Sequence, residues 1–221
     1  MNVIIAGEES GTIRDAFARL GHNAWSCDIR PSASKEGNHW VGSWRGIEWP
    51  YWDLLIAHPE CTHLAVSGAR HFPAKQKDGR QQTAIAEFIY LADAPVPMKA
   101  IEQPISIMSR LYRKPDQIIQ PHQFGHDASK STCLWLTGLP KLTHTNAIKP
   151  RLVCCGSVID ESLGKYGCAN CGGENTAKPR WGNQTDSGQN SLAPSLDRWK
   201  IRSKTYDGIA NAMAAQWGKL C

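Results

Sequence analysis

The sequence predicts an α/β domain, in which a mostly parallel central sheet carries helices on both of its faces. Short apolar runs rich in β-branched residues alternate with stretches whose apolar residues recur at helical spacing, and the first strand, helix, strand unit spans residues 2–29. Such a unit predicts parallel pairing with a right-handed crossover. A chain of 221 residues is long enough for one domain of this kind and a small appendage.

The first unit opens with the run NVIIAG at residues 2–7, which predicts a strand that ends in glycine. Apolar residues at helical spacing then predict a helix that Gly21 ends, and NAWSCDI at residues 23–29 predicts the second strand. Residues 30–50 are polar and rich in Trp, Gly and Ser, and they indicate only a weak strand near HWVG.

The same rhythm continues along the chain. WDLLIAHP (52–59) predicts a buried strand, residues 78–94 a helix, and VPMKAIEQP (96–104) a strand broken by Pro104. The remaining elements are one or two helical turns in 105–113, strands in 116–125 and 130–138, and a closing amphipathic helix in 202–218.

The composition is that of an ordinary globular protein, with 41% hydrophobic and 20% charged residues. No apolar run approaches the roughly 18 residues that a membrane helix requires, and MNVIIAGEES lacks the basic leader of a signal peptide. We therefore expect a soluble, cytoplasmic protein without a membrane partner, and a monomer is favoured. The net charge of +5 suits a polyanion partner but is common among proteins that bind none.

Residues 151–190 change in character to Gly, Cys, Asn and Lys, which predicts an insertion into an α/β domain made of residues 1–150 and 191–221. The insertion carries Cys154, Cys155, Cys168 and Cys171, and the second pair forms a C-x-x-C knuckle. Four thiolates favour a structural zinc ion, which would stabilise an insertion too small for its own core. The adjacent first pair departs from usual zinc-ribbon spacing, and a reduced loop is the alternative; a redox role lacks an electron partner.

Two reactive side chains follow predicted strands. Cys61 comes after the strand at 53–57 and Glu102 after the strand at 97–101, so neighbouring strands would bring both to one crevice. A thiolate nucleophile and an acid that can donate to a ring nitrogen are the groups that add across a conjugated ring. A cysteine hydrolase using His58 or His63 is disfavoured, because neither a third orienting group nor an oxyanion hole is visible.

Several motifs in order resemble the DNA cytosine 5-methyltransferases, and the short phage-type members most closely. This chain has PEC at 59–61 where that family has a Pro-Cys dipeptide after the fourth strand, and EQP at 102–104 where it has ENV or ENP. FGHDASKST echoes a further element, with Lys130 and Thr132 in place of two arginines. Glu60 and Gln103 also depart from the pattern, and Ser43 stands where the family often has an acidic residue.

The resemblance implies a class I methyltransferase-like (Rossmann-like) fold and transfer of a methyl group from S-adenosylmethionine to carbon 5 of cytosine in DNA. Cys61 and Glu102 would be catalytic. The protein would act in the cytoplasm of a bacterial host cell, encoded by the bacterium or by a phage. The implied donor-binding residues are Ala6, Gly7, Glu8, Gly11, Asp28, Ile29, His58 and Pro59, and the implied substrate-binding residues are Gln103, Lys130, Thr132 and Arg70.

Other functions stay open. The departures are compatible with a non-catalytic nucleic-acid-binding protein of the same fold, or with an enzyme that modifies a pyrimidine nucleotide. A nicotinamide dehydrogenase is disfavoured because AGEESG lacks the G-x-G-x-x-G spacing. Glu8 and Glu9 could cap the first helix instead of touching a ligand. Packing or base stacking could explain the tryptophans, and Trp40, Trp44, Trp49 and Trp52 are the candidates for stacking.

Two short basic clusters, RLYRK at 110–114 and RWKIRSK at 198–204, could contact phosphates, although solvated faces are the commoner role of such runs. The insertion at 151–190 is the only candidate for a target-recognition domain, so we expect short sequence specificity or help from a partner.

Overall fold

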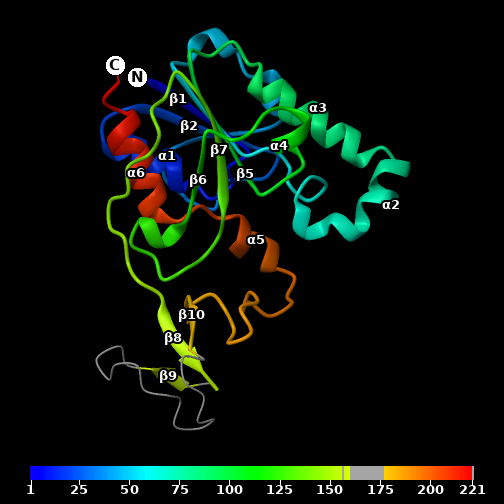
Figure 1. Cartoon of the computed structure of the whole chain (residues 1–221). Helices are drawn as coiled ribbons and strands as arrows, with labels where there is room; N and C mark the ends of the chain where they lie inside the picture. The colour runs from blue at the N-terminus through cyan, green and yellow to red at the C-terminus, as the bar shows by residue number, and fades with distance from the viewer. Residues whose placement is uncertain (156, 160–176, 221) are drawn as a thin grey trace. The chain divides into compact units, whose positions relative to one another are not determined.

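The computed structural model describes residues 1–155, 157–159 and 177–220. The chain divides into two compact units (Figure 1). The first, which we call the sheet unit, comprises Met1–Ile119, Lys130–Thr143 and Lys204–Cys221, and the second, the small unit, comprises Gln120–Ser129 and His144–Ser203. This division does not follow the boundaries at 150 and 190 expected from composition, and the assignment of those segments as domains stays a prediction.

The sheet unit contains a seven-stranded sheet in the order β3-β2-β1-β4-β5-β7-β6. The first five strands of that order pair in parallel, whereas β7 is antiparallel to both of its neighbours. The α/β, class I methyltransferase-like fold predicted from the sequence is therefore confirmed. The strands are β1 Asn2–Ala6, β2 Asn23–Asp28, β3 Asn38–Val41, β4 Leu54–Ala57, β5 Met98–Pro104, β6 Gln117–Ile119 and β7 Thr132–Thr137.

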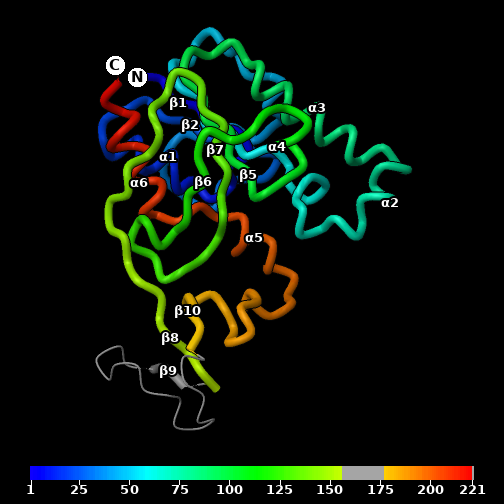
Figure 2. Tube along the Cα trace, in the orientation of Figure 1, coloured from blue at the N-terminus to red at the C-terminus, as the bar shows by residue number. Residues whose placement is uncertain are grey.

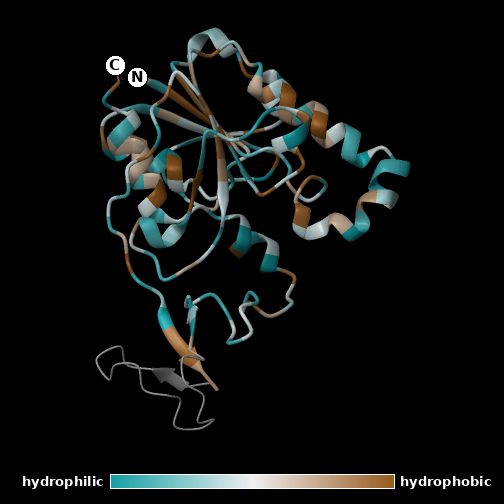
Figure 3. Cartoon of the chain, in the orientation of Figure 1, coloured by the Kyte–Doolittle hydropathy of each residue, from teal (hydrophilic) through white to brown (hydrophobic). Residues whose placement is uncertain are grey.

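Helices cover both faces of this sheet because successive strand residues point to opposite sides. Ile4 and Leu55 pack with Phe88 of α3 (Arg80–Ala92) in one core cluster. On the other face α1 (Thr12–Arg19) packs against α6 (Asp207–Trp217), and Figure 2 shows the last helix beside the first. The hydrophobic colours of Figure 3 accordingly gather on the central strands.

Several short elements differ from the sequence expectation. The segment 30–50 holds β3 and the single-turn helices η1 (Trp44–Gly46) and η2 (Trp49–Tyr51, ending just beyond it). The strand expected over 116–125 is only β6, because Pro121 begins the turn η4 (Pro121–Gln123). The other short helices are η3 Val66–His71, α2 Phe72–Lys77, α4 Met108–Leu111 and α5 Arg198–Ser203.

The tryptophans of the 40–52 region are packing residues. Trp49 is buried in the core cluster, and Trp40, Trp44 and Trp52 are partly buried against it. Trp40 packs so closely on Gly46 that a Cβ there would require the ring to shift, and its contact with Gly42 is also tight. Of the two roles that the sequence left open, packing is therefore the one that the structure supports.

The small unit contains a three-stranded antiparallel sheet of β8 (Arg151–Cys154), β9 (Ser157–Ile159) and β10 (Lys178–Arg180). The Sγ atoms of Cys154 and Cys155 lie 3.8 Å apart. Among the residues that the structure describes, no three His, Cys, Asp or Glu side chains are grouped to hold a metal ion. Cys168 and Cys171 lie outside the described residues, so the zinc site stays a prediction. None of the described helices is both long and apolar enough to cross a membrane.

Candidate active site

Four neighbouring parallel strands reach one edge of the sheet together, where β1, β2 and β4 end and β5 continues to Pro104. Ala6 of β1 pairs with Cys27 on one side and Ala57 on the other, and Ala57 pairs with Ile101 of β5. The next residues along the chain are therefore Gly7, Asp28, His58 and Glu102, in four adjacent positions. Ligands of open parallel sheets bind beyond this edge, so the register itself gathers the predicted site residues.

The loop that carries Cys61 is tied to the end of β5 by a side chain. Gln103 is 1% exposed, and its amide nitrogen donates to the carbonyl oxygens of Pro59 at 3.2 Å and Glu60 at 3.3 Å. The Cys61 carbonyl in turn accepts hydrogen bonds from two backbone N–H groups, those of Leu64 and Ala65, which form a tight turn. The structure thus places the half-buried Cys61 on a fixed loop beside the strand that bears Glu102.

His58 and Glu102 form an ion pair. Nδ1 of His58 lies 3.0 Å from Oε2 of Glu102, and their side chains are 17% and 11% exposed. Burial lowers the pKa of His58, but the charges of Glu102 and Glu8 outweigh it, so the pKa stands above its ordinary value. Burial raises the pKa of Glu102, yet His58 and Lys130 bring the net shift below the ordinary value. The pair therefore rests as imidazolium and carboxylate.

Cys61 rests as a thiol. Burial and then the charge of Glu60 raise the pKa of Cys61, and the charge of Lys130 offsets part of that rise. Lys130 also acts on His58 and Glu102, so it lies within electrostatic range of the whole group. Because the thiolate is the nucleophilic form, a reaction at this sulfur needs its proton removed when the substrate binds.

Glu8 caps the first helix. Its carboxylate oxygens accept the backbone N–H groups of Ile13 at 2.7 Å and Arg14 at 3.2 Å, and burial raises the pKa of Glu8. The side chain is 5% exposed, which fits the capping alternative that the sequence left open. Gly7 beside it has φ 80°, and its Cα approaches the His58 carbonyl so closely that no Cβ would fit.

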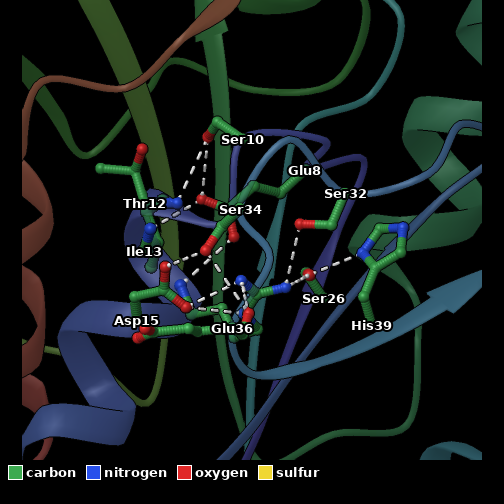
Figure 4. A network of polar contacts seen from close by, with 11 residues as sticks. Glu8, Ser10, Thr12, Ile13, Asp15, Ser26, Ser32, Ser34, Glu36 and His39 are labelled. Atoms are coloured by element: carbon green, nitrogen blue, oxygen red, sulfur yellow. Dashed lines mark hydrogen bonds and ion pairs between the residues drawn. The ribbon is translucent and has the colours of Figure 1, made fainter.

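A buried arginine that sequence reasoning missed organises the segment after β2. Arg14 is fully buried, and its guanidinium donates to Asp15 Oδ1, the hydroxyls of Ser26 and Ser32, and the Glu36 carbonyl oxygen. Figure 4 shows these partners converging, with His39 bonded to Ser26 at 2.8 Å. The only signal in the sequence is its place three residues before Phe17, on the buried face of α1.

Two of the residues predicted to bind the methyl donor, Asp28 and Ile29, lie at the end of β2. Oδ1 of Asp28 accepts the Arg30 N–H at 3.0 Å, and the apolar side chain of Ile29 is 71% exposed. A carboxylate that can accept ribose hydroxyls, beside an exposed apolar side chain for a purine, fits a nucleoside-bearing donor. Gly11 has φ 73°, whereas the side chains of Ala6 and Pro59 are buried.

The predicted substrate-binding residues are spread more widely. The hydroxyl of buried Thr132 donates to the Lys130 carbonyl oxygen, and the exposed Arg70 donates through Nε to His71. In the basic cluster at 110–114, Arg113 pairs with Asp116 at 2.7 Å. Thus Cys61, Gln103 and Lys130 gather with the ion pair, while the side chain of Thr132 is engaged in its own strand.

A scan against protein-family models and a search of curated proteins found no match to this chain. Among solved structures, the chain is similar to one provisionally described as a DNA modification methyltransferase encoded within a prophage (E. coli). The alignment has 13% sequence identity and a TM-score of 0.44, and it covers 81% of this chain. This chain spans about half of that structure's chain, 52% of its length.

Proposed function

We propose that this protein transfers a methyl group from S-adenosylmethionine to carbon 5 of cytosine in DNA, through a covalent adduct with Cys61. The observation that carries the proposal is the junction at the sheet edge, where Gln103 fixes the Cys61 loop against the strand that bears Glu102. A nucleophile on the loop after one strand and a carboxyl group on the adjacent parallel strand are the pair needed to activate a pyrimidine ring.

The residues would divide the reaction as follows. The Cys61 thiol loses its proton to water, and its Sγ then forms a bond to carbon 6 of the ring while ring nitrogen 3 takes a proton through Glu102, so that carbon 5 becomes nucleophilic. The bound donor would supply the methyl group. The proton on carbon 5 then passes to water, the S–C6 bond breaks to return the thiolate, and the proton on nitrogen 3 goes back through Glu102, which restores the aromatic ring. Asp28 and Ile29 would hold the donor, with the turn at Gly7 beneath it.

DNA is the proposed substrate because the chain has an excess of positive charge and the site has a lysine near the nucleophile, and both favour binding of a polyanion. The chain carries a net charge of +5, and Lys130 lies within electrostatic range of Cys61. A base inside a duplex must be extruded before Cys61 can reach it, at a cost of about a few kcal/mol that the pocket must recover. We expect activity to fall as salt rises, because phosphate contacts release counterions.

The test is incubation of the purified chain with labelled S-adenosylmethionine and DNA, followed by mass spectrometry of the nucleosides. We expect 5-methylcytosine from the wild type and from Cys133→Ala, and none from Cys61→Ser. Cys133 is the matched control because it is a buried strand cysteine whose pKa is raised to about 11. Tight DNA binding with no label from any variant would instead identify a non-catalytic binder, and a labelled free nucleotide would identify a nucleotide-modifying enzyme.

We further propose that the small unit binds one structural zinc ion through Cys154, Cys155, Cys168 and Cys171. The support is the C-x-x-C spacing of the second pair and the 3.8 Å separation of the first two sulfur atoms. Metal analysis of the purified chain should give about one zinc per chain. Less than half an equivalent in a folded preparation would contradict the site.

A further inference from the structure

We propose that His58 is a positioning residue that holds a proton on Nδ1 for Glu102 and passes it to that carboxyl group as the cytosine ring is activated. The inference rests on the proposed function and assigns to the same site a histidine that the motif resemblance places only near the methyl donor. It starts from the 3.0 Å approach of His58 Nδ1 to Glu102 Oε2.

The backbone holds the two side chains opposite each other. The His58 N–H donates to the Ala6 carbonyl oxygen at 2.8 Å, which continues the β1–β4 ladder by one residue. Ala57 and Ile101 pair in register, so His58 and Glu102 are the next opposed residues of β4 and β5. Gly7 packs against the His58 carbonyl with no room for a Cβ, which limits displacement of the histidine backbone. The ion pair is therefore built into the sheet rather than formed by two flexible surface chains.

Charged groups from each neighbouring element act on this histidine. Glu102 comes from β5, and Glu8 comes from the turn between β1 and α1; both attract a proton to the imidazole. Lys130, which precedes β7, repels it, and Cys61 and Glu60 follow on the same loop as His58. The attractive charges prevail over burial and Lys130, so His58 carries its proton at a pH where an ordinary histidine has begun to lose it.

Two polar atoms of this pair lack a hydrogen bond among the described residues. Nε2 of His58 is buried and has no hydrogen-bond partner among the described residues. Oε2 of Glu102 likewise has no hydrogen-bond partner among those residues, although Nδ1 lies 3.0 Å from it. Catalytic hydrogen bonds are often poorly aligned before substrate binds and tighten in the complex. A small rotation of Glu102 toward the ring nitrogen of cytosine is all that the transfer requires.

The proton on ring nitrogen 3 cycles within the pair, whereas the proton of the Cys61 thiol and the proton of carbon 5 are exchanged with solvent water. When the Sγ–C6 bond forms, ring nitrogen 3 takes a proton from Glu102, and Glu102 takes the Nδ1 proton of His58, which becomes neutral. When the S–C6 bond breaks, the proton on nitrogen 3 returns to Glu102 and then to Nδ1. The shared proton is therefore neither consumed nor lost, and the pair is ready for the next turnover.

The shape of the pH profile separates this role from a structural one. In the wild type one proton is shared by the pair, so the transfer rate should fall on the alkaline side as pH rises through the raised pKa of His58. In His58→Gln, Glu102 must hold the proton by itself. The decline of the methyl-transfer rate on the alkaline side of its pH profile (the alkaline limb) should therefore begin at a lower pH. We expect a loss of about 10²-fold in the methyl-transfer rate on the alkaline side of the ordinary histidine pKa, and a much smaller loss in acid.

The experiment measures single-turnover methyl transfer against pH for the wild type, His58→Gln and His22→Gln. His22 is the matched control because it is a half-buried histidine at the start of β2 whose pKa burial lowers, away from the site. A second readout is the NMR titration of His58 in the wild type and in Glu102→Gln, where the histidine pKa should fall.

The outcomes separate the two proposals. A shifted alkaline limb in His58→Gln, with a lowered His58 pKa in Glu102→Gln, supports the proton-holding role. Wild-type transfer with a His58→Gln profile of unchanged shape, or an unmoved His58 titration, would overturn it while leaving the proposed function intact. A wild type that transfers no methyl group at any pH would overturn the proposed function, and the inference with it.

Discussion

Gln103 controls, at the scale of single residues, how the nucleophile meets the carboxyl group. Its amide donates to two carbonyl oxygens of the loop before Cys61, while its own backbone belongs to the strand that bears Glu102. Where the resembled motif has asparagine, this chain has a longer amide whose side chain reaches the loop before Cys61. The departure from the motif therefore has a structural use in this chain.

Replacing Gln103 by methionine keeps the size of the side chain and removes the donor. We expect a stability loss of about 1–3 kcal/mol, because two buried carbonyl oxygens lose a partner. We also expect a lower maximal rate of methyl transfer with nearly unchanged donor affinity, because the Cys61 loop is released while the donor residues are untouched. Denaturant unfolding and transfer kinetics measure the two effects.

Gln117→Met is the matched control. Gln117 of β6 makes two side-chain hydrogen bonds to the backbone of Leu142 and none to the Cys61 loop, and it lies two strands from Glu102, since both pair with Leu134 of β7. The Gln117→Met variant should have a lower free energy of unfolding and an unchanged rate of methyl transfer. If Gln103→Met transfers methyl groups as fast as Gln117→Met, the bridge does not position Cys61.

The ion pair predicts a pH window for stability. His58 has a raised folded pKa, so its contribution is full below the ordinary value of 6.5 and is lost as pH rises through the folded value. Glu102 has a lowered folded pKa, so its contribution is full above 4.5 and is lost as pH falls through the folded value. A double-mutant cycle of His58→Gln and Glu102→Gln, measured by denaturant unfolding, should therefore give its largest coupling between those values. Coupling that stays constant from acid to alkaline pH would contradict the pair.

The reactive residues themselves could be predicted from sequence, but their partners could not. Cys61 and Glu102 stand out because each follows an apolar strand and the Pro-Cys and Glu-x-Pro contexts are visible in one dimension. The pairing of His58 with Glu102 depends on strand register and side-chain direction, which no local pattern encodes. For the same reason Glu8 could be assigned either to a ligand or to the helix terminus that it caps.

At the scale of elements, the buried side chain of Arg14 ties the segment between β2 and β3 to the first helix. Arg14 projects from α1 and joins Ser32 and the Glu36 carbonyl, while Ser34 donates to Asp15 at 3.0 Å. These bonds secure residues 32–36, which follow Asp28 and Ile29 directly. The buried guanidinium therefore links the first helix to the part of the edge assigned to the methyl donor.

Arg14→Lys should weaken binding of S-adenosylmethionine more than it slows the transfer step. Lysine keeps the charge but lacks the planar fork that reaches several acceptors at once, so the segment after Asp28 loses its support. Removing one partner of a buried charged network lowers the free energy of unfolding by about 3–5 kcal/mol. Lysine should retain part of the interaction, so the loss in Arg14→Lys should be smaller. Calorimetric titration of the donor and saturation kinetics check the effect.

The control for this substitution is Arg19→Lys, which lies on the same helix. Arg19 is exposed and donates to Asn211 of α6. Its replacement should leave donor affinity unchanged. Equal donor affinity in Arg14→Lys and the wild type would show that the network supports the fold only.

Long periodic elements were predictable, and short ones were not. The helix over 80–92 and the strands around Leu55 and Ile101 each have an apolar pattern that tertiary contacts reinforce. The 30–50 segment contains turns of three residues whose conformation is fixed by packing of Trp40 and Trp44 against the core. β6 is short because Pro121 cannot continue the ladder, a signal that the apolar residues before it obscured.

At the scale of the whole molecule, the strand order brings motifs that are distant in sequence to one edge of the sheet. The parallel run β2-β1-β4-β5 places four strand ends side by side, so Gly7, Asp28, His58 and Glu102 become neighbours although they span nearly a hundred residues. Repeated strand and helix periods predicted the α/β class, and the family resemblance predicted the class I arrangement. The contact-based division into a sheet unit and a small unit was not predictable, because it follows contacts of 120–129 and 144–150 that carry no compositional change.

The central claim is that Cys61 bonds to carbon 6 of a cytosine, and trapping of the adduct tests it most directly. With 5-fluorocytosine in the DNA, the ring carries no proton at carbon 5 that could be lost after methylation, so the S–C6 bond cannot break by elimination. Incubation with S-adenosylmethionine should give a species with the mass of the chain, the oligonucleotide and one methyl group, mapped to Cys61 by peptide sequencing and absent from Cys61→Ser. The account would be contradicted if the chain methylates ordinary DNA but forms no adduct with the 5-fluorocytosine DNA. An adduct at a residue other than Cys61 would also contradict it.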